Sequence, residues 1–344
     1  METKPFSFAG FSAQIPSDWD VSTIKIEEDE TVIGIRDLVK GRLEVTWQSA
    51  GWKKVKEEAR KKNKSPEKKL LDPESVAKNY HEKAMKKVKG LVFLDEVRKE
   101  KVNGHAAVIS EWTQGDEEGY EAIWYCGVSD RYYYLRYVDG DNSDTFEQIL
   151  KSVVCHSSLS YTKWQYLGLD LRLPNDYHIT EQKAEVGKIT VVFTGHWPER
   201  QRKKGAISWL RPQPLPEPRR FIVTRWNMIR YGSNELKSWC QNQAVSLIKK
   251  YVGESRKVSE GNAVVNGHEA VFQVYSIGGG LLRKPSGYSV VYAWICPQSK
   301  SAYLAVNPLV QGAKLDIPEE QIAKGMDYVR CHVEPLASTE SGEG

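Results

Sequence analysis

The sequence predicts an α+β fold of two tandem domains, each an antiparallel-sheet sandwich with helices packed on the sheet. The first observation is a repeated phrase, since Val102–Val108 (VNGHAAV) returns as Val265–Val271 (VNGHEAV). The second is that the landmarks of Gly10–Trp19 return in Gly168–Tyr177, in the same order. The third is the order of elements in each half, which is typical of helices laid on a sheet. Shared landmarks at similar spacing indicate duplication of a whole domain.

The repeat also sets the expected domain boundaries. A chain of 344 residues with 40% hydrophobic content is long enough for two domains that each bury a core. We expect the first domain over residues 1–157 and the second over residues 161–336, joined by a serine-rich junction. Residues 337–344 lack apolar anchors and are expected to be disordered.

The first strands of each half are predicted from alternation and from the turn residues that end them. Phe6 to Ile15 alternates loosely and stops at Pro16, and Leu167–Leu173 does the same in the second half. A further strand follows in each half, and both of these strands are β-branched and end in an aromatic residue: Gly41–Trp47 and Gly187–Phe193.

A long helix comes next in each half. Asp72 can cap the first helix with Pro73 at its first position, an apolar residue recurs at every fourth position, and Gly90 can close the end. In the second half Ser233 or Asn234 is expected to cap a similar apolar stripe, which Gly253 closes.

Tight Asn-Gly hairpin turns follow, because asparagine and glycine tolerate positive φ. After each turn the pattern predicts three strands and a short terminal helix. The strands are expected near 105–113, 120–128 and 131–138, and again near 268–277, 287–296 and 301–307, and the helices over Asp144–Val154 and Pro318–Val329.

This element order resembles the PsbP-like sandwich fold, a family that includes the extrinsic subunit of photosystem II and the Ran-binding nuclear import factor. The order is strand, Ile15-Pro16 followed by Trp19, strand, helix, strand, Asn-Gly turn, strands and terminal helix, once per half. The resemblance implies an antiparallel sheet flanked by helices, in a protein that acts mostly by binding partners. Large inserts after Trp47 and Phe193 depart from a compact member, so the resemblance does not identify the partner.

Two basic inserts are expected at the same topological position, between a strand and the long helix. The insert at 52–69 holds nine basic residues against three glutamates: Lys53, Lys54, Lys56, Arg60, Lys61, Lys62, Lys64, Lys68 and Lys69. In the insert at 197–226, the stretch from Arg200 to Arg225 holds eight against Glu217: Arg200, Arg202, Lys203, Lys204, Arg211, Arg219, Arg220 and Arg225. Because the whole chain carries only +4, the remainder is acidic.

Clustered basic side chains bind polyanions even when the whole protein is nearly neutral. In the second insert, tryptophans such as Trp209 lie among the arginines and offer flat faces for stacking on bases. RNA, in a ribosome or another ribonucleoprotein, is therefore the leading partner class. The alternative is that the first insert is a solvated helix face, with Glu/Lys pairs at i,i+4, and that residues 211–218 are a stiff proline-rich strut.

Four cysteines belong to the repeat: Cys126 with Cys155, and Cys296 with Cys331. A cysteine on a strand and one just beyond the terminal helix can meet where the helix packs on the sheet, as a disulfide or thiol pair. Unrelated core cysteines remain an alternative, and so does a metal site that adds His156 or His332, although no CxxC motif supports it. Cys240 lies on an apolar helical stripe and is interpreted as core. His105 and His268 follow turns and are interpreted as exposed.

No phosphate-binding loop, nucleophile elbow, zinc-protease motif or dinucleotide fingerprint is present, and Gly278–Gly280 lacks the Lys-Ser/Thr that a P-loop needs. We therefore expect a non-catalytic binding protein without a cofactor. RNA binding is the first hypothesis, a protein-interaction adaptor the second, and a small-molecule or metal-binding protein with Cys/His sites the third.

The start of the chain lacks a basic and apolar leader, and no apolar stretch reaches membrane-spanning length. The sequence therefore predicts a cytoplasmic protein that has no membrane partner. Its richness in lysine and glutamate is compatible with a thermophilic source.

Overall fold

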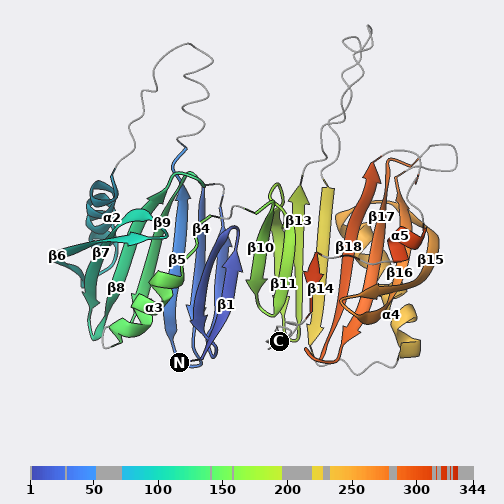
Figure 1. Cartoon of the computed structure of the whole chain (residues 1–344), viewed down its shortest axis with the longest axis horizontal. Helices are drawn as coiled ribbons and strands as arrows, with labels where there is room; N and C mark the ends of the chain where they lie inside the picture. Colours follow the sequence, from blue (N-terminus) through green and yellow to red (C-terminus); the bar gives the residue numbers. More distant parts are fainter. Residues whose placement is uncertain are drawn as a thin grey trace, which may run out of the picture. The chain divides into compact units, whose positions relative to one another are not determined.

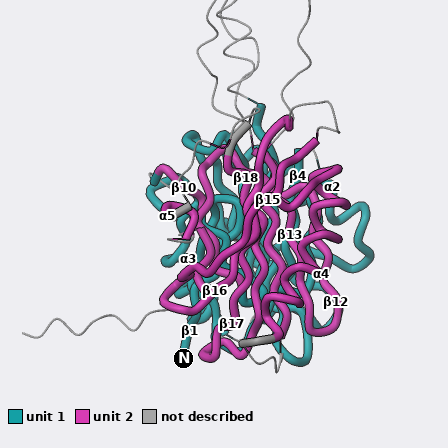
Figure 2. The backbone as a smooth tube through the Cα atoms, turned by 90° about the vertical axis from the view of Figure 1, so that its right-hand side faces the viewer, with its two compact units in different colours: residues 1–159, 163–168 teal, residues 160–162, 169–344 magenta. Residues whose placement is uncertain are grey.

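The computed structural model describes most of the chain and divides it into two units. The described residues are 2–27, 29–51, 72–139, 142–156, 159–195, 219–227, 233–278, 285–311, 315, 319–323, 326 and 328–331. Unit 1 comprises residues 1–159 and 163–168, and unit 2 comprises residues 160–162 and 169–344 (Figure 2). Both units are mainly β. The α+β expectation is therefore corrected, because antiparallel strands outweigh the few helices.

Unit 1 is built on a seven-stranded antiparallel sheet with the order β3-β4-β5-β9-β8-β7-β6 (Figure 1). Neighbours in this order pair along most of their lengths. The strands are β3 (Asp20–Ile26), β4 (Glu30–Arg36), β5 (Gly41–Ser49), β6 (Leu91–Val102), β7 (His105–Gln114), β8 (Glu117–Cys126) and β9 (Arg131–Val138).

The two faces of this sheet carry different elements, because neighbouring residues on a strand point to opposite sides. Helix α2 (Pro73–Lys87) packs over Ile123 and Tyr134. The hairpin of β1 (Thr3–Phe8) and β2 (Phe11–Pro16) packs on the other face, where Phe11 stacks with Tyr133. Helix α3 (Ser143–Ser152) lies against β2, and β10 (Tyr161–Tyr166) pairs with β1.

Unit 2 has a second sheet with the order β12-β13-β14-β18-β17-β16-β15. Matched strand for strand along the chain, this is the order of the first sheet. The strands are β12 (His178–Glu185), β13 (Lys188–Gly195), β14 (Arg219–Asn227), β15 (Ser255–Val265), β16 (His268–Ile277), β17 (Gly287–Cys296) and β18 (Ser301–Gln311). Helix α4 (Ser233–Tyr251) packs on β16, β17 and β18. The remaining elements are β11 (Leu169–Pro174), α5 (Glu319–Ala323) and β19 (Val329–Arg330), which pairs with β11.

The predicted turn and cap residues occupy the expected positions. The Asp72 side chain accepts a hydrogen bond from the Ser75 backbone N–H, and Pro73 is the first residue of α2. Asn103 and Asn266 have φ of 47° and 52°, each followed by a glycine of positive φ, so both hairpins turn in two residues. Glycine and asparagine reach this backbone region with little strain, which explains the repeated Asn-Gly pairs.

The expected equivalence of the two inserts is wrong. The first lies between β5 and α2, whereas the second lies between β13 and β14, one strand earlier. The structural counterpart of β5 is therefore β14, since both pair with the strand that follows the last turn, β9 or β18. The sequence pattern does not distinguish β5 from β13, because both are β-branched runs with an aromatic residue near the end.

The strands at the sheet edges share an irregularity. The register of each shifts against its inner neighbour, between Val21 and Thr23 in β3, Phe93 and Val97 in β6, Ile179 and Glu181 in β12, and Lys257 and Ser259 in β15. Charged residues accompany the shifts: β6 contains RKEK, β12 contains EQKAE and β15 begins SRK. Such bulges locally twist a strand away from regular pairing.

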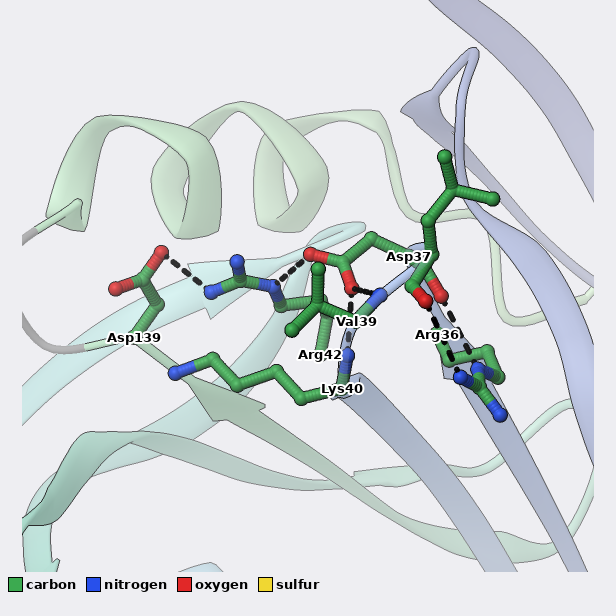
Figure 3. A network of polar contacts seen from close by, with 7 residues as sticks. Arg36, Asp37, Val39, Lys40, Arg42 and Asp139 are labelled. Atoms are coloured by element: carbon green, nitrogen blue, oxygen red, sulfur yellow. Dashed lines mark hydrogen bonds and ion pairs between the residues drawn. The ribbon is translucent and has the colours of Figure 1, made fainter.

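Asp37 is the hub of a polar network at the β4–β5 turn (Figure 3). Its Oδ1 accepts the backbone N–H groups of Val39 and Lys40, each at 2.7 Å, and its Oδ2 accepts Arg42 Nε at 2.6 Å. Arg42 also donates through Nη1 to Asp139 at 2.8 Å. The backbone bond from Lys40 and the Arg42 guanidinium lower the pKa of Asp37 to about 2.

Asp37→Asn is expected to weaken unit 1 at neutral pH but not in strong acid. A carboxylate whose folded pKa is depressed stabilises the fold above its unfolded pKa of about 4, and this contribution is lost as pH falls through about 2. Urea unfolding of both proteins from pH 2 to pH 6 measures the difference. A gap between them that is as wide at pH 2 as at pH 6 would contradict the assignment.

Candidate metal centre

Four ligand-type side chains meet at one end of the unit 1 sheet. His105 is the first residue of β7, directly after the Asn-Gly turn, and Cys126 is the last residue of β8. Cys155 and His156 follow α3, where Val154 exchanges two backbone hydrogen bonds of 2.8 Å with Ser12 of β2. That bridge leads the chain back beside the sheet, which brings residues thirty apart in sequence into contact.

The ligand atoms of these four residues all lie within 4.8 Å of one another. His156 Nδ1 is 3.3 Å from Cys126 Sγ and 3.5 Å from Cys155 Sγ. The rings of His105 and His156 are 5.4 Å apart, edge to face. Both cysteines are buried free thiols and both histidines are half-buried, so the cluster is compact and largely shielded from water.

One atom of the cluster lacks a partner. His105 Nε2 is buried and makes no hydrogen bond within the described structure. Buried polar groups are normally satisfied, and an unsatisfied one in a folded protein calls for an explanation such as an ion. The interpretation of His105 as an exposed turn residue is therefore wrong, because its ring lies against the cysteine cluster.

The surroundings of the two sulfurs favour the charged form of Cys126. The Ser129 backbone N–H points to Cys126 Sγ at 3.5 Å, and Asn103 Nδ2 donates to Cys155 Sγ at 3.4 Å. A hydrogen bond between the two thiols lowers the pKa of Cys126 and raises the pKa of Cys155, and burial raises the latter further. The thiolate form of Cys126 is thus favoured, beside Cys155 Sγ, which can donate a hydrogen bond to it.

The dimensions of the cluster suit a tetrahedral zinc ion. Zinc binds cysteine sulfur at about 2.3 Å and histidine nitrogen at about 2.0–2.1 Å, so sulfur and nitrogen on two corners of a tetrahedron lie about 3.6 Å apart. The two Nδ1–Sγ distances of 3.3 and 3.5 Å are close to that value. Two sulfur and two nitrogen ligands also match the closed sets found in structural zinc sites.

The basic residues of the two inserts, which include the residues predicted to bind RNA, lie with Trp209 mostly outside the described residues. This applies to Lys53, Lys54, Lys56, Arg60, Lys61, Lys62, Lys64, Lys68 and Lys69, and to Arg200, Arg202, Lys203, Lys204, Trp209 and Arg211.

The last three arginines of the second insert lie instead in strand β14. Arg219 pairs with Asp176 at 2.6 Å, Arg220 donates to the Tyr251 carbonyl, and Arg225 Nε donates to Ser301 Oγ at 3.1 Å. These side chains hold unit 2 together, so the basic segment is shorter than its sequence suggested.

Comparisons with known proteins give distant structural likenesses only. No family model and no curated protein matches the chain. The solution structure of the cyanobacterial PsbP from Synechocystis is 12% identical, with 45% of this chain and 92% of that chain covered and a TM-score of 0.34. The immunity protein TplEi of a Pseudomonas aeruginosa type VI secretion system is 10% identical, with 93% and 92% covered and a TM-score of 0.31. Each likeness concerns the fold alone, and the first is a distant PsbP-like one.

No helix among the described residues is both long and apolar enough to cross a membrane.

Proposed function

We propose that the protein is a metal-binding protein whose unit 1 holds a zinc ion through Cys126, Cys155, His105 and His156. The supporting observation is the convergence of two sulfurs and two imidazoles within 4.8 Å of one another. A second, independent observation is that His105 Nε2 is buried and unpaired, because a metal ion supplies the partner that this atom lacks.

The position of the site indicates what the metal does for the fold. Its ligands come from the start of β7, the end of β8 and the segment after α3. A four-ligand site leaves no coordination position for a substrate, so the role is structural rather than catalytic. The ion links the segment after α3 to the end of the sheet. There Tyr133 Oη already donates a hydrogen bond to the Cys155 carbonyl at 2.8 Å.

Metal analysis of the full chain, purified without chelators, tests this proposal. We expect Cys126→Ser with Cys155→Ser to lose the unit 1 zinc, and His105→Asn to weaken its binding. Cys240→Ala is the matched control, since Cys240 is equally buried but lies on α4, in the apolar core of unit 2. Unchanged metal content in the Cys126/Cys155 variant would overturn the proposal, as would an intact mass showing a Cys126–Cys155 disulfide in protein purified under reducing conditions.

Free buried thiols and a thiolate metal site fit a reducing compartment, and we therefore propose a cytoplasmic location. We also propose that the two units arose by duplication. The identical strand orders, the two Asn-Gly turns and the matching cysteines support this.

RNA binding through the basic segments is a second candidate function, and the charge of the sequence favours it. Residues 52–69 hold nine lysines and arginines against three glutamates, in a chain whose net charge is only +4. Such a segment neutralises several phosphates at once, so its affinity for RNA should fall steeply with salt.

Reversing charge at Lys61, Lys62, Arg202 and Lys203 tests the RNA candidate. We expect the affinity for single-stranded RNA to fall at least tenfold and the salt dependence to become shallower. Reversing Lys183 and Lys257, which are strand lysines in ion pairs with Glu185 and Glu260, is the control. A partner recovered from cells that survives nuclease treatment would favour the adaptor role instead.

A further inference from the structure

A second cluster of ligand-type side chains lies at the equivalent end of the unit 2 sheet. His268 is the first residue of β16 and Cys296 the last residue of β17, while Cys331 directly follows β19. One ligand atom from each of the three lies within 4.8 Å of the others. We propose that this cluster binds a second zinc ion, independently of the first. The inference extends the proposed function to unit 2 and rests on it only for the identity of the metal.

The framework around the unit 2 cluster repeats that of unit 1. The Ser299 backbone N–H points to Cys296 Sγ at 3.4 Å, as Ser129 does to Cys126 at 3.5 Å. Trp294 stacks on Tyr303 at 5.2 Å and 9°, the values found for Trp124 and Tyr133. A repeated framework presents its ligands in the same way, which supports a shared role.

In both units, the chain returns to the sheet through a backbone pairing that precedes the second cysteine. In unit 1 the bridge between Val154 and Ser12 precedes Cys155. In unit 2, Val329 pairs with Leu171 of β11, two residues before Cys331. Tyr303 Oη then donates to the Cys331 carbonyl at 3.5 Å, the counterpart of the bond between Tyr133 and Cys155. The backbones of Cys155 and Cys331 are therefore held in place, so their side chains are positioned before a metal binds.

The two clusters differ in the surroundings of the strand cysteine. Cys126 Sγ contacts His156 Nδ1, whereas Cys296 Sγ donates to Gln298 Oε1 at 3.4 Å and to the Cys331 carbonyl at 3.7 Å. A thiol that donates to oxygen still carries its proton, and metals bind the thiolate. Zinc binding in unit 2 therefore requires Cys296 Sγ to leave these two acceptors.

Cobalt titration of the metal-free full chain separates the two sites. Thiolate-bound cobalt gives a charge-transfer band, and we expect it to saturate at two equivalents per chain. Cys296→Ser with Cys331→Ser should reduce saturation to one equivalent, and so should the Cys126/Cys155 variant. Cys240→Ala should keep both. Saturation at one equivalent, lost only in the Cys126/Cys155 variant, would overturn the second site and leave the proposed function standing. Loss only in the Cys296/Cys331 variant would overturn the proposed function instead.

Alkylation of the unmutated chain keeps the test valid if a variant misfolds. Zinc should slow the labelling of Cys296 and Cys331 at least tenfold, read peptide by peptide by mass spectrometry, while labelling of Cys240 stays unchanged. Equal labelling of Cys296 and Cys331 with and without zinc would overturn the second site.

Discussion

Arg136→Val is expected to lower the free energy of unfolding of unit 1 by about 1–3 kcal/mol. Arg136 lies directly across from Glu44 of β5 and from Glu121 of β8, on the sheet face under α2. The Glu121 side chain is 0% exposed and its Oε1 lies 2.8 Å from His81 Nε2, whereas the Glu44 side chain is exposed. Removing the arginine takes a positive charge away from the buried Glu121 carboxylate, and it also removes the guanidinium that sits 4.0 Å over the Trp112 ring.

The residues of unit 2 indicate which further substitutions should restore the stability lost in Arg136→Val. At the same register positions unit 2 has Ile222, Val306 and Val291, all fully buried under α4. The triple variant Glu44→Ile, Arg136→Val and Glu121→Val is therefore expected to recover most of the stability lost in the single variant, because it removes the buried Glu121 carboxylate together with its counter-charge.

Urea unfolding with hydrogen exchange read in β8 and β9 measures both effects. Arg98→Val is the control, since Arg98 is half-exposed in its ion pairs with Glu100 and Glu147, and it should cost less than about 1 kcal/mol. A single variant as stable as the triple one would show that Arg136 does not balance the buried Glu121 carboxylate.

Removing zinc is expected to produce the second large effect, a loss of about 4 kcal/mol from unit 1 when free zinc stands at a thousand times its dissociation constant. The metal binds only the folded arrangement of His105, Cys126 and the segment after α3, so binding energy becomes folding energy. Calorimetry of the full chain with and without a chelator measures the shift. The Cys126→Ser and Cys155→Ser variant should unfold at the same temperature in both conditions, and a chelator shift that persists in this variant would place the effect elsewhere.

Local signals predicted much of the fold. Asp72, Pro73 and the two Asn-Gly turns act through the conformations of their own backbones, so sequence placed α2 and both β-hairpins correctly. Ala9-Gly10 splits the predicted strand Phe6–Ile15 into β1 and β2, and Ala9 adopts a φ of 50° that its residue type does not signal. Strand β12 was missed because HITEQKAE is polar on both faces, as an edge strand can be.

The candidate site was predicted in part. The repeated cysteine pairs indicated that Cys126 would meet Cys155, which the structure places together, and their redox state stays a prediction. The role of His105 depends on the bridge between Val154 and Ser12, and no local pattern encodes a contact made across the whole unit. The second appearance of histidine after an Asn-Gly turn, at His268, was the signal that could have revealed it.

The bulged outer strands make this chain a poor template for fibrils. An open sheet edge invites another chain to add a strand, and flat, uncharged edges do so most readily. In both units the edge strands break their register and carry lysine, arginine or glutamate where an incoming strand would pair. Two seven-stranded sheets can therefore share one polypeptide without their edges recruiting neighbouring molecules at high concentration.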